Sequence, residues 1–214
     1  MTVSAVIPTY NRHDLLIDRA LASVLRQTVP VDEIIIVADG ESEESFAALW
    51  NDPRIQRITP TRGDPSLRLV NIERPAYPQH PGDFWLTQGW KARNTGLDMA
   101  TGDYIAPLDD DDEWTDDHIE LLLGAINSTG ADFAYGKAVT PWGQWYGHWP
   151  PSGANFTDGS QLYRRDLGYR YDPECLSRGK AEDQDLWDRM VEGGVKFTFV
   201  EKLVHRYYPA RGKP

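Results

Sequence analysis

Short apolar runs alternate with amphipathic segments along the first part of the chain. Residues 4–12 open on an apolar run, and residues 33–38 are apolar without alternation, which is typical of strands covered on both faces. Residues 14–26 place apolar side chains at three- and four-residue intervals and are predicted to form a helix. A second helix is predicted over residues 42–50 and a short strand over residues 55–58. This order favours a parallel sheet with helical crossovers.

Residues 60–89 interrupt this pattern, because proline, glycine and charged residues dominate them. Only residues 67–72 resemble a strand there, so we expect an excursion or a mobile loop. Residues 141–151 carry four aromatic side chains among glycines and are expected to form a loop. Elsewhere the periodicity predicts helices over residues 90–100, after Thr115 and over residues 182–191, and strands over residues 104–108, 131–139, 196–200 and 203–207. We therefore expect an α/β fold with a mostly parallel central sheet flanked by helices.

Length and charge restrict the function classes. The 214 residues suffice for one large domain. The net charge of −11 repels phosphate backbones and anionic lipid surfaces, so nucleic acid is a poor candidate partner. No apolar run approaches the ~20 residues of a membrane span and no signal-peptide pattern begins the chain, so we expect a cytoplasmic protein without stable membrane insertion. Because Cys175 is the single cysteine, oxygen or imidazole must hold any metal.

Four consecutive aspartates, residues 109–112, directly follow the strand predicted over residues 104–108. Adjacent carboxylates repel one another unless a cation or solvent relieves them. Ligands of open α/β sheets bind beyond the carboxyl ends of the strands, and hard oxygen ligands suit Mg²⁺ or Mn²⁺. The cluster therefore predicts a divalent metal site, with a solvated acidic turn at the start of the next helix as the alternative.

A second acidic feature opens the helix predicted over residues 182–191. Asp183 lies three residues from Leu186, four from Trp187 and seven from Met190, which predicts that it shares the buried stripe of this helix and points inward. Asp185 and Asp188 are expected to face solvent. The alternative for Asp183 is a helix-capping role, which is common for aspartate in a first turn.

Two segments carry a resemblance to a known family. Residues 91–114, KARNTGLDMATGDYIAPLDDDDEW, and residues 5–12, AVIPTYNR, resemble the family 2 glycosyltransferases of the GT-A fold. The resemblance implies one GT-A-type domain over residues 1–214, with a nucleotide-sugar-binding half at 1–112 and an acceptor-binding half at 113–214. It also implies metal-dependent, inverting transfer of a sugar from a nucleotide-diphosphate donor, expected to carry uridine, to an acceptor hydroxyl. The acceptor and the oligomeric state remain open.

The resemblance also implies roles for individual residues. The residues expected to bind the donor are Pro8, Thr9, Tyr10, Asn11, Asp39, Arg93, Asp109 and Asp110. Asp111 and Asp109, with His205, are expected to hold Mn²⁺ or Mg²⁺, and Asp183 is the expected catalytic base. Residues 60–89 are longer than the family's usual connection, so no donor contacts are transferred to them.

The residues predicted to bind the acceptor are supported by less specific sequence patterns. Trp142, Trp145 and Trp149 could stack on sugar faces, since aromatic rings pack against C–H groups, or they could anchor the loop. Glu182 is a further acceptor-binding candidate beside Asp183. Two other functions share these features. They are a catalytically silent module that binds nucleotide sugars, and a nucleotidyltransferase or phosphohydrolase, which also gathers aspartates at strand ends.

Overall fold

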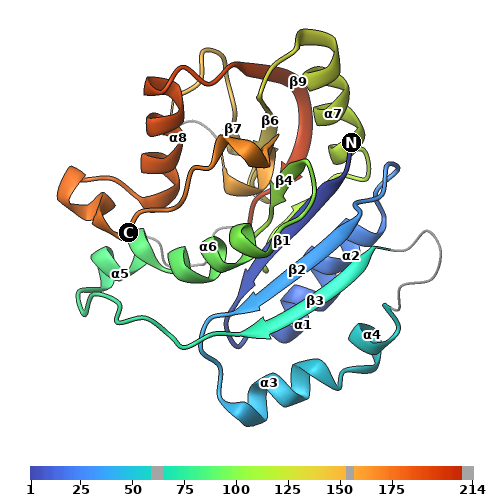
Figure 1. Cartoon of the computed structure of the whole chain (residues 1–214), viewed down its shortest axis with the longest axis vertical. Coiled ribbons are helices and arrows are strands. Elements are labelled where there is room, and N and C mark those ends of the chain that lie inside the picture. Colours follow the sequence, from blue (N-terminus) through green and yellow to red (C-terminus); the bar gives the residue numbers. More distant parts are fainter. Residues whose placement is uncertain (59–64, 153–156, 209–214) are drawn as a thin grey trace.

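The computed structural model has at its centre a nine-stranded sheet, formed within the described residues 1–58, 65–152 and 157–208 (Figure 1). The strands are β1 (Val3–Thr9), β2 (Glu33–Ala38), β3 (Ser66–Asn71), β4 (Tyr104–Pro107), β5 (Glu113–Trp114), β6 (Phe133–Val139), β7 (Trp145–Tyr146), β8 (Gln161–Arg164) and β9 (Phe197–Arg206). Their order is β3-β2-β1-β4-β8-β6-β9-β5, and β7 pairs with β6 outside this path.

Most neighbouring strands of the first half run parallel. Strands β3, β2, β1 and β4 pair in parallel, as do β6 and β9, whereas β8, β5 and β7 run antiparallel to their neighbours. The carboxyl ends of β1, β2 and β4 consequently meet at one edge of the sheet. This arrangement confirms the predicted α/β fold with a central sheet. Among the described strands, four pairings are parallel and four are antiparallel.

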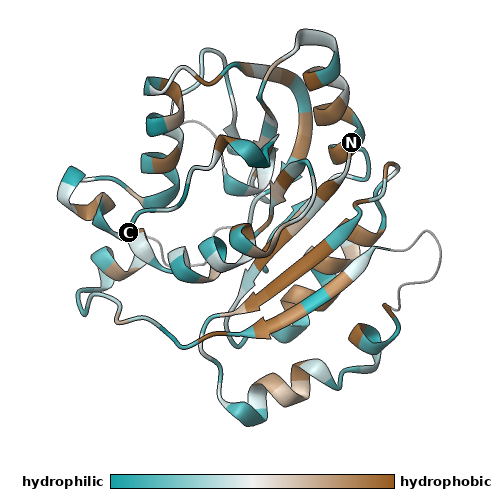
Figure 2. Cartoon of the chain, in the orientation of Figure 1, coloured by the Kyte–Doolittle hydropathy of each residue, from teal (hydrophilic) through white to brown (hydrophobic). Residues whose placement is uncertain are grey.

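Helices cover both faces of the sheet. The helical elements are α1 (His13–Leu15), the π-helical η1 (Leu16–Leu21), α2 (Ala22–Leu25), α3 (Glu43–Trp50), α4 (Pro53–Gln56), α5 (Pro81–Thr87), α6 (Trp90–Met99), α7 (His118–Thr129) and α8 (Glu182–Glu192), with 3₁₀ turns η2 (Asp158–Ser160), η3 (Arg165–Leu167) and η4 (Pro173–Arg178). Ile34 and Ile36 of β2 pack with Leu16 on one face, while Ile35 packs with Leu97 of α6 on the other. Because both faces are covered, β1 and β2 are apolar along most of their length (Figure 2).

The predicted strand over residues 55–58 is wrong, because Ile55 and Gln56 form the end of helix α4 and the two residues after them belong to no strand. Pro53 stands in the first turn of that helix, and the Asp52 carboxylate accepts a hydrogen bond from the Arg54 amide at 2.8 Å. A short apolar run cannot by itself distinguish a strand from a helix, and here the capping residues decide. The third parallel strand is β3, within the stretch that looked like an excursion.

Two further expectations need correction in the second half. The segments 196–200 and 203–207, expected as two strands, form the single strand β9, whose register against β6 shifts at Gly136 and Lys137. The aromatic stretch 141–151 is not wholly a loop, since β7 pairs with β6 as a short hairpin. Among the described residues, none of the helices combines the length and the apolar character needed to cross a bilayer.

Candidate active site

A cavity of about 640 Å³ lies at the sheet edge where β1, β2 and β4 end. Loop amides and helix N-termini converge at this edge in open α/β sheets, which is why ligands bind there. The predicted site residues that line the cavity are Pro8, Thr9, Tyr10, Asp39, Arg93, Asp109, Asp111, Glu182 and Asp183. Segments far apart in the sequence therefore share one cavity, including the aspartates after β4 and the first turn of α8.

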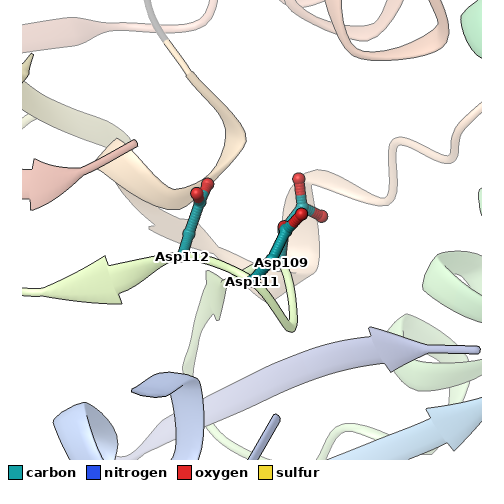
Figure 3. A group of neighbouring side chains, drawn as sticks. All are labelled: Asp109, Asp111 and Asp112. Atoms are coloured by element: carbon teal, nitrogen blue, oxygen red, sulfur yellow. The ribbon is translucent and has the colours of Figure 1, made fainter. Parts of the chain in front are cut away.

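Three aspartates of the turn between β4 and β5 project to the same side (Figure 3). Asp109, Asp111 and Asp112 each offer a carboxylate oxygen, and these oxygens lie within 4.8 Å of one another. Burial and the neighbouring carboxylates of Asp112 and Asp109 raise the pKa of Asp111 to about 6. Ionisation of this group is therefore opposed in the protein alone, and a cation among the three oxygens would relieve it. The oxygen-only set fits a hard divalent cation such as Mg²⁺ or Mn²⁺.

The fourth aspartate of the run turns inward. Asp110 is fully buried, accepts a hydrogen bond from Thr9 Oγ1 at 2.8 Å and pairs with Arg12 Nη2 at 2.5 Å. Burial raises its pKa to about 7 against the opposing effect of Arg12. Asp110 is not among the cavity-lining residues, so the expected direct contact with the donor is corrected to a supporting position beneath Thr9 and Arg12.

His205 lies behind the aspartates instead of among them. It is fully buried on β9, with Nε2 3.1 Å from Asp112 Oδ2 and Nδ1 2.7 Å from Thr157 Oγ1. The amide of Tyr208 donates to the other Asp112 oxygen at 2.7 Å. His205 is therefore not one of the three converging groups. The third carboxylate is that of Asp112, and its two oxygens are held by His205 and by the Tyr208 amide.

Arg93 on α6 gathers three carboxylates. Its guanidinium contacts Asp109 at 2.5 Å, Asp158 at 3.1 Å and Glu182 at 2.6 Å, and Nη1 also donates to the Gln88 carbonyl at 3.0 Å. Its side chain is 13% exposed, so water screens these interactions little. Burial nevertheless raises the pKa of Asp158 to about 7 and holds that of Glu182 well above its usual range. One arginine thus pairs with three carboxylates, and burial raises the pKa of two of them, Asp158 and Glu182, above the usual range.

Two glycines explain how Arg93 can lie so close to the ends of the strands. Helix α6 approaches β1 so closely that a Cβ at Gly96 would clash with Val6. At the start of the helix, Gly89 has a φ of 90° and a Cβ there would clash with the guanidinium. Glycine at these two positions lets the helix and the arginine reach the strand ends.

Asp183 stands in the first turn of α8, where this helix meets the cavity. The Gln184 amide donates to Asp183 Oδ1 at 2.7 Å, and the side chain is half-buried at the cavity wall. The buried stripe of the helix holds Glu182 and Asp185 instead, which corrects the expected inward position of Asp183. Asp185 was expected to face solvent, yet it is 1% exposed and pairs with Arg178 at 2.5 Å and Arg189 at 2.7 Å.

Asp39, directly after β2, forms the far end of the cavity and is 5% exposed. Tyr77 donates its hydroxyl hydrogen to Asp39 Oδ2 at 2.8 Å, whereas buried Oδ1 has no hydrogen-bond partner within the described residues. The guanidinium of Arg74 lies over the Tyr10 ring at 3.6 Å. The expected contact of Asn11 with the donor is corrected. Asn11 does not line the cavity, and its side-chain oxygen accepts a hydrogen bond from the Ser45 hydroxyl.

The three tryptophans of the acceptor prediction do not line the cavity. Trp142, Trp145 and Trp149 are 62%, 58% and 57% exposed on and around the β6–β7 hairpin. Their placement in an acceptor pocket is therefore corrected. Tyr146, the neighbour of Trp145 in β7, does line the cavity and packs edge-on against Tyr207.

Sequence reasoning missed several charged lining residues, namely Arg12, Arg74, Asp112 and Asp158. Asp112 carried a signal as the last member of the aspartate run. Arg12 likewise stands in the segment that carried the resemblance. Arg74 and Asp158 had no signal, because both lie in stretches without periodicity and reach the cavity only through the fold.

The cavity and the sheet agree with comparisons to known proteins. A profile described as glycosyl transferase family 2 matches residues 4–62 and 88–182, more than half of the chain. The chain belongs to this family. It is 36% identical over 139 residues to the uncharacterized glycosyltransferase YwdF of Bacillus subtilis (strain 168), across 64% of this chain and 42% of that protein. It is 34% identical over 152 residues to the succinoglycan biosynthesis protein ExoW of Rhizobium meliloti (strain 1021), across 68% and 40%.

A solved structure supports the same fold. TarS 1-349 of S. aureus, in complex with UDP, superposes with a TM-score of 0.71 at 18% identity and covers 97% of this chain and 60% of that chain. This similarity confirms the expected GT-A-type α/β fold of the family. The chain spans less than half the length of the curated relatives it matches, with 42% of YwdF and 40% of ExoW covered.

Proposed function

We propose that this protein transfers a sugar from a uridine-diphosphate donor to an acceptor hydroxyl, with a bound divalent cation and with inversion at the anomeric carbon. One observation carries the proposal. Asp183 lines the same cavity as Asp109 and Asp111, although more than seventy residues separate the two segments. This places a carboxylate of α8 and the aspartate cluster around one space that a donor sugar could occupy.

The nucleoside would bind at the far end of the cavity. Asp39 Oδ1 is buried and has no hydrogen-bond partner in the part of the chain that the structure describes, which is costly unless a ligand supplies a donor. The N3–H of uracil is such a donor, and the exposed Tyr10 ring offers a stacking surface. UDP and UDP-GlcNAc are the ligands named for two TarS structures with this fold, which supports a uridine donor.

The reacting step needs one base and stabilisation of the leaving group. The acceptor oxygen forms a bond to the anomeric carbon as its proton passes to an Asp183 oxygen. The bond to the diphosphate breaks at the same carbon and its electron pair leaves with the diphosphate, so a single displacement inverts configuration. Because a carboxylate is a weak base towards a sugar hydroxyl, proton transfer accompanies bond formation instead of preceding it.

Asp109, Asp111 and Asp112 would hold the divalent cation. When bound, the cation neutralises charge that develops on the diphosphate oxygens. Arg12 lies beside this group, with Nη1 2.5 Å from Asp111 Oδ2, and adds positive charge at the same place. Arg93 keeps Asp109 and Glu182 in position through its ion pairs. Few of its N–H groups are therefore left to bind the phosphates of the nucleotide sugar.

The acceptor would enter between α8 and the β6–β7 hairpin. Glu182 and Tyr146 line this side of the cavity. The name of ExoW refers to succinoglycan biosynthesis, and a carbohydrate acceptor agrees with an aromatic ring at this place. In this proposal residues 1–112 contribute most donor contacts and residues 113–214 most acceptor contacts.

Product analysis tests the reaction class. The chain should release UDP from a UDP-sugar in the presence of Mn²⁺ or Mg²⁺, because the sugar–phosphate bond breaks. Release of pyrophosphate or inorganic phosphate would instead favour a nucleotidyltransferase or a phosphohydrolase. Binding of UDP-sugars without turnover, across a broad acceptor panel, would favour a silent binding module.

Replacing Asp111 by Asn tests the cation site. We expect Mn²⁺ binding, measured by calorimetry without substrate, to weaken by roughly ten- to a hundredfold, because one of three converging oxygens loses its charge. Asp116→Asn is the matched control, since Asp116 is exposed beyond the turn and pairs with Arg26. Equal Mn²⁺ affinity in Asp111→Asn and the parent chain would contradict the assignment.

A further inference from the structure

Tyr77 contacts the cavity-lining Asp39 from a segment outside the family match. The profile leaves residues 63–87 unmatched, and the described part of this segment supplies β3, Arg74, Tyr77 and α5. Phe84 of α5 packs edge-on against the Tyr77 ring at 5.5 Å, and Arg74 lies over the same ring at 5.2 Å. The position of this tyrosine is therefore defined by its neighbours on two sides.

The hydrogen bonds of Tyr77 have a fixed direction. The Gly89 amide donates to the tyrosine oxygen at 2.9 Å, so the hydroxyl hydrogen is directed to Asp39 Oδ2 at 2.8 Å. Burial and the Asp39 carboxylate raise the pKa of Tyr77, which keeps that hydrogen in place. Oδ2 thus accepts one hydrogen bond, and Arg74 Nη1 lies 3.6 Å from it. Among the described residues, buried Oδ1 has no hydrogen-bond partner.

A carboxylate with one available oxygen recognises bases differently from one with two. Guanine presents two adjacent donors, N1–H and the 2-amino group, which together match both oxygens of a carboxylate. Uracil presents the single donor N3–H between two carbonyl oxygens. A second uncapped carboxylate oxygen would face one of those carbonyls, whereas an oxygen already bonded to Tyr77 is screened from it.

We infer that Tyr77 is a specificity-determining residue for the nucleobase of the donor, because its hydroxyl caps Asp39 Oδ2 and leaves one oxygen for a base with a single N–H. The inference rests on the proposed uridine-donor function and adds a residue from the unmatched segment to it. Tyr77 acts through Asp39, so it is a positioning residue and takes no part in the reacting step.

Calorimetry with three nucleotides at constant Mn²⁺ tests the inference. The probes are UDP, GDP and inosine diphosphate, which equals GDP without the 2-amino group. In the parent chain GDP should bind no more tightly than inosine diphosphate, because the 2-amino group would have to compete with the Tyr77 hydroxyl for Oδ2. In Tyr77→Phe the second oxygen is released, and GDP should gain roughly tenfold over inosine diphosphate.

Tyr104→Phe is the matched control, because Tyr104 begins β4 at the opposite end from the aspartate turn and should leave all three affinities unchanged. Three results overturn the inference: tighter binding of GDP than of inosine diphosphate by the parent chain, equal gains for both in Tyr77→Phe, or no measurable GDP binding by that variant. The first result needs no variant and so holds even if Tyr77→Phe fails to fold.

The proposed function is tested apart from Tyr77 by comparing UDP with N3-methyl-UDP on the parent chain. Methylation removes the N3–H donor and should weaken binding by roughly tenfold or more. Failure of the parent chain to bind UDP overturns the uridine-donor proposal itself, together with the inference. UDP binding with an unchanged GDP to inosine diphosphate ratio in Tyr77→Phe overturns the inference alone.

Discussion

Replacing Asp183 by Asn should lower kcat for sugar transfer by about 10²–10⁴-fold, the usual contribution of a positioned general base. The substitution keeps the size of the side chain and its place in the first turn of α8, but it removes the oxygen that accepts the proton. UDP binding should be retained, because Asp39 and Tyr10 at the far end of the cavity are unchanged. Steady-state rates at saturating donor, with calorimetry for UDP, separate the two effects.

Asp188→Asn is the matched control for this prediction. Asp188 lies on the same helix, pairs with Lys180 at 2.8 Å and is not among the cavity-lining residues. Its replacement should leave kcat unchanged, since neither donor nor acceptor reaches it in the proposed arrangement. Retention of more than about a tenth of the activity in Asp183→Asn would remove Asp183 from the role of base.

Replacing Arg93 by Met should lower the free energy of unfolding by about 3–5 kcal/mol, the usual cost of leaving buried charges without their partner. Asp109, Asp158 and Glu182 would then face one another with no cation between them. Urea denaturation measures the effect as a lower midpoint at an unchanged slope. Arg164→Met is the control, because Arg164 forms its ion pairs with Asp132 and Asp166 in solvent, where such pairs contribute little.

The pH dependence of the free energy of unfolding gives a second test of the Arg93→Met prediction. Without Arg93 the pKa of Glu182 and of Asp158 in the folded protein should rise further above the unfolded values. Groups with raised folded pKa contribute stability below the unfolded pKa and lose it as the pH rises through the folded pKa. The deficit of Arg93→Met should therefore grow as the pH rises through and above about 7, the folded pKa of Asp158 in the parent chain. Two results would contradict the charge explanation. One is a loss of unfolding free energy that does not change with pH, and the other is no recovery of stability when Glu182→Gln is added to Arg93→Met.

These two residues have different tasks in one cavity. Asp183 lies half-buried where α8 begins and lines the same cavity as the aspartates, as the proposed role of base requires. Arg93 is almost enclosed and holds carboxylates that come from three separate segments. Loss of Asp183 should affect the reaction and spare the fold, whereas loss of Arg93 should affect both.

The local pattern of the sequence was sufficient for the main elements. Unbroken apolar runs predicted β1 and β2, and three- and four-residue spacing predicted the helices that include α6 and α8, because burial of a regular element imposes its own period on the sequence. The same reasoning failed at α4, where four residues are too few to show a period and Pro53 with Asp52 set the conformation.

The aspartate run shows what the local sequence pattern cannot predict. Its position after β4 predicted a metal site, but not which carboxylates converge. Asp109, Asp111 and Asp112 face the cavity and Asp110 faces Thr9, because the turn between β4 and β5 has no regular period from which a direction could be read. His205 was selected from a resemblance, and only the pairing of β5 with β9 placed it behind Asp112.

By itself the sequence determined the α/β class, the parallel sheet and the presence of acidic chemistry at the ends of its strands, because these depend on interactions between near neighbours in the chain. Only the tertiary structure decided the partners of Arg93, the hydrogen bond of Tyr77 to Asp39 and the position of the three tryptophans outside the cavity lining. Such contacts join segments dozens of residues apart, and they are set by how helices and loops pack on the sheet, for which residue spacing carries no signal.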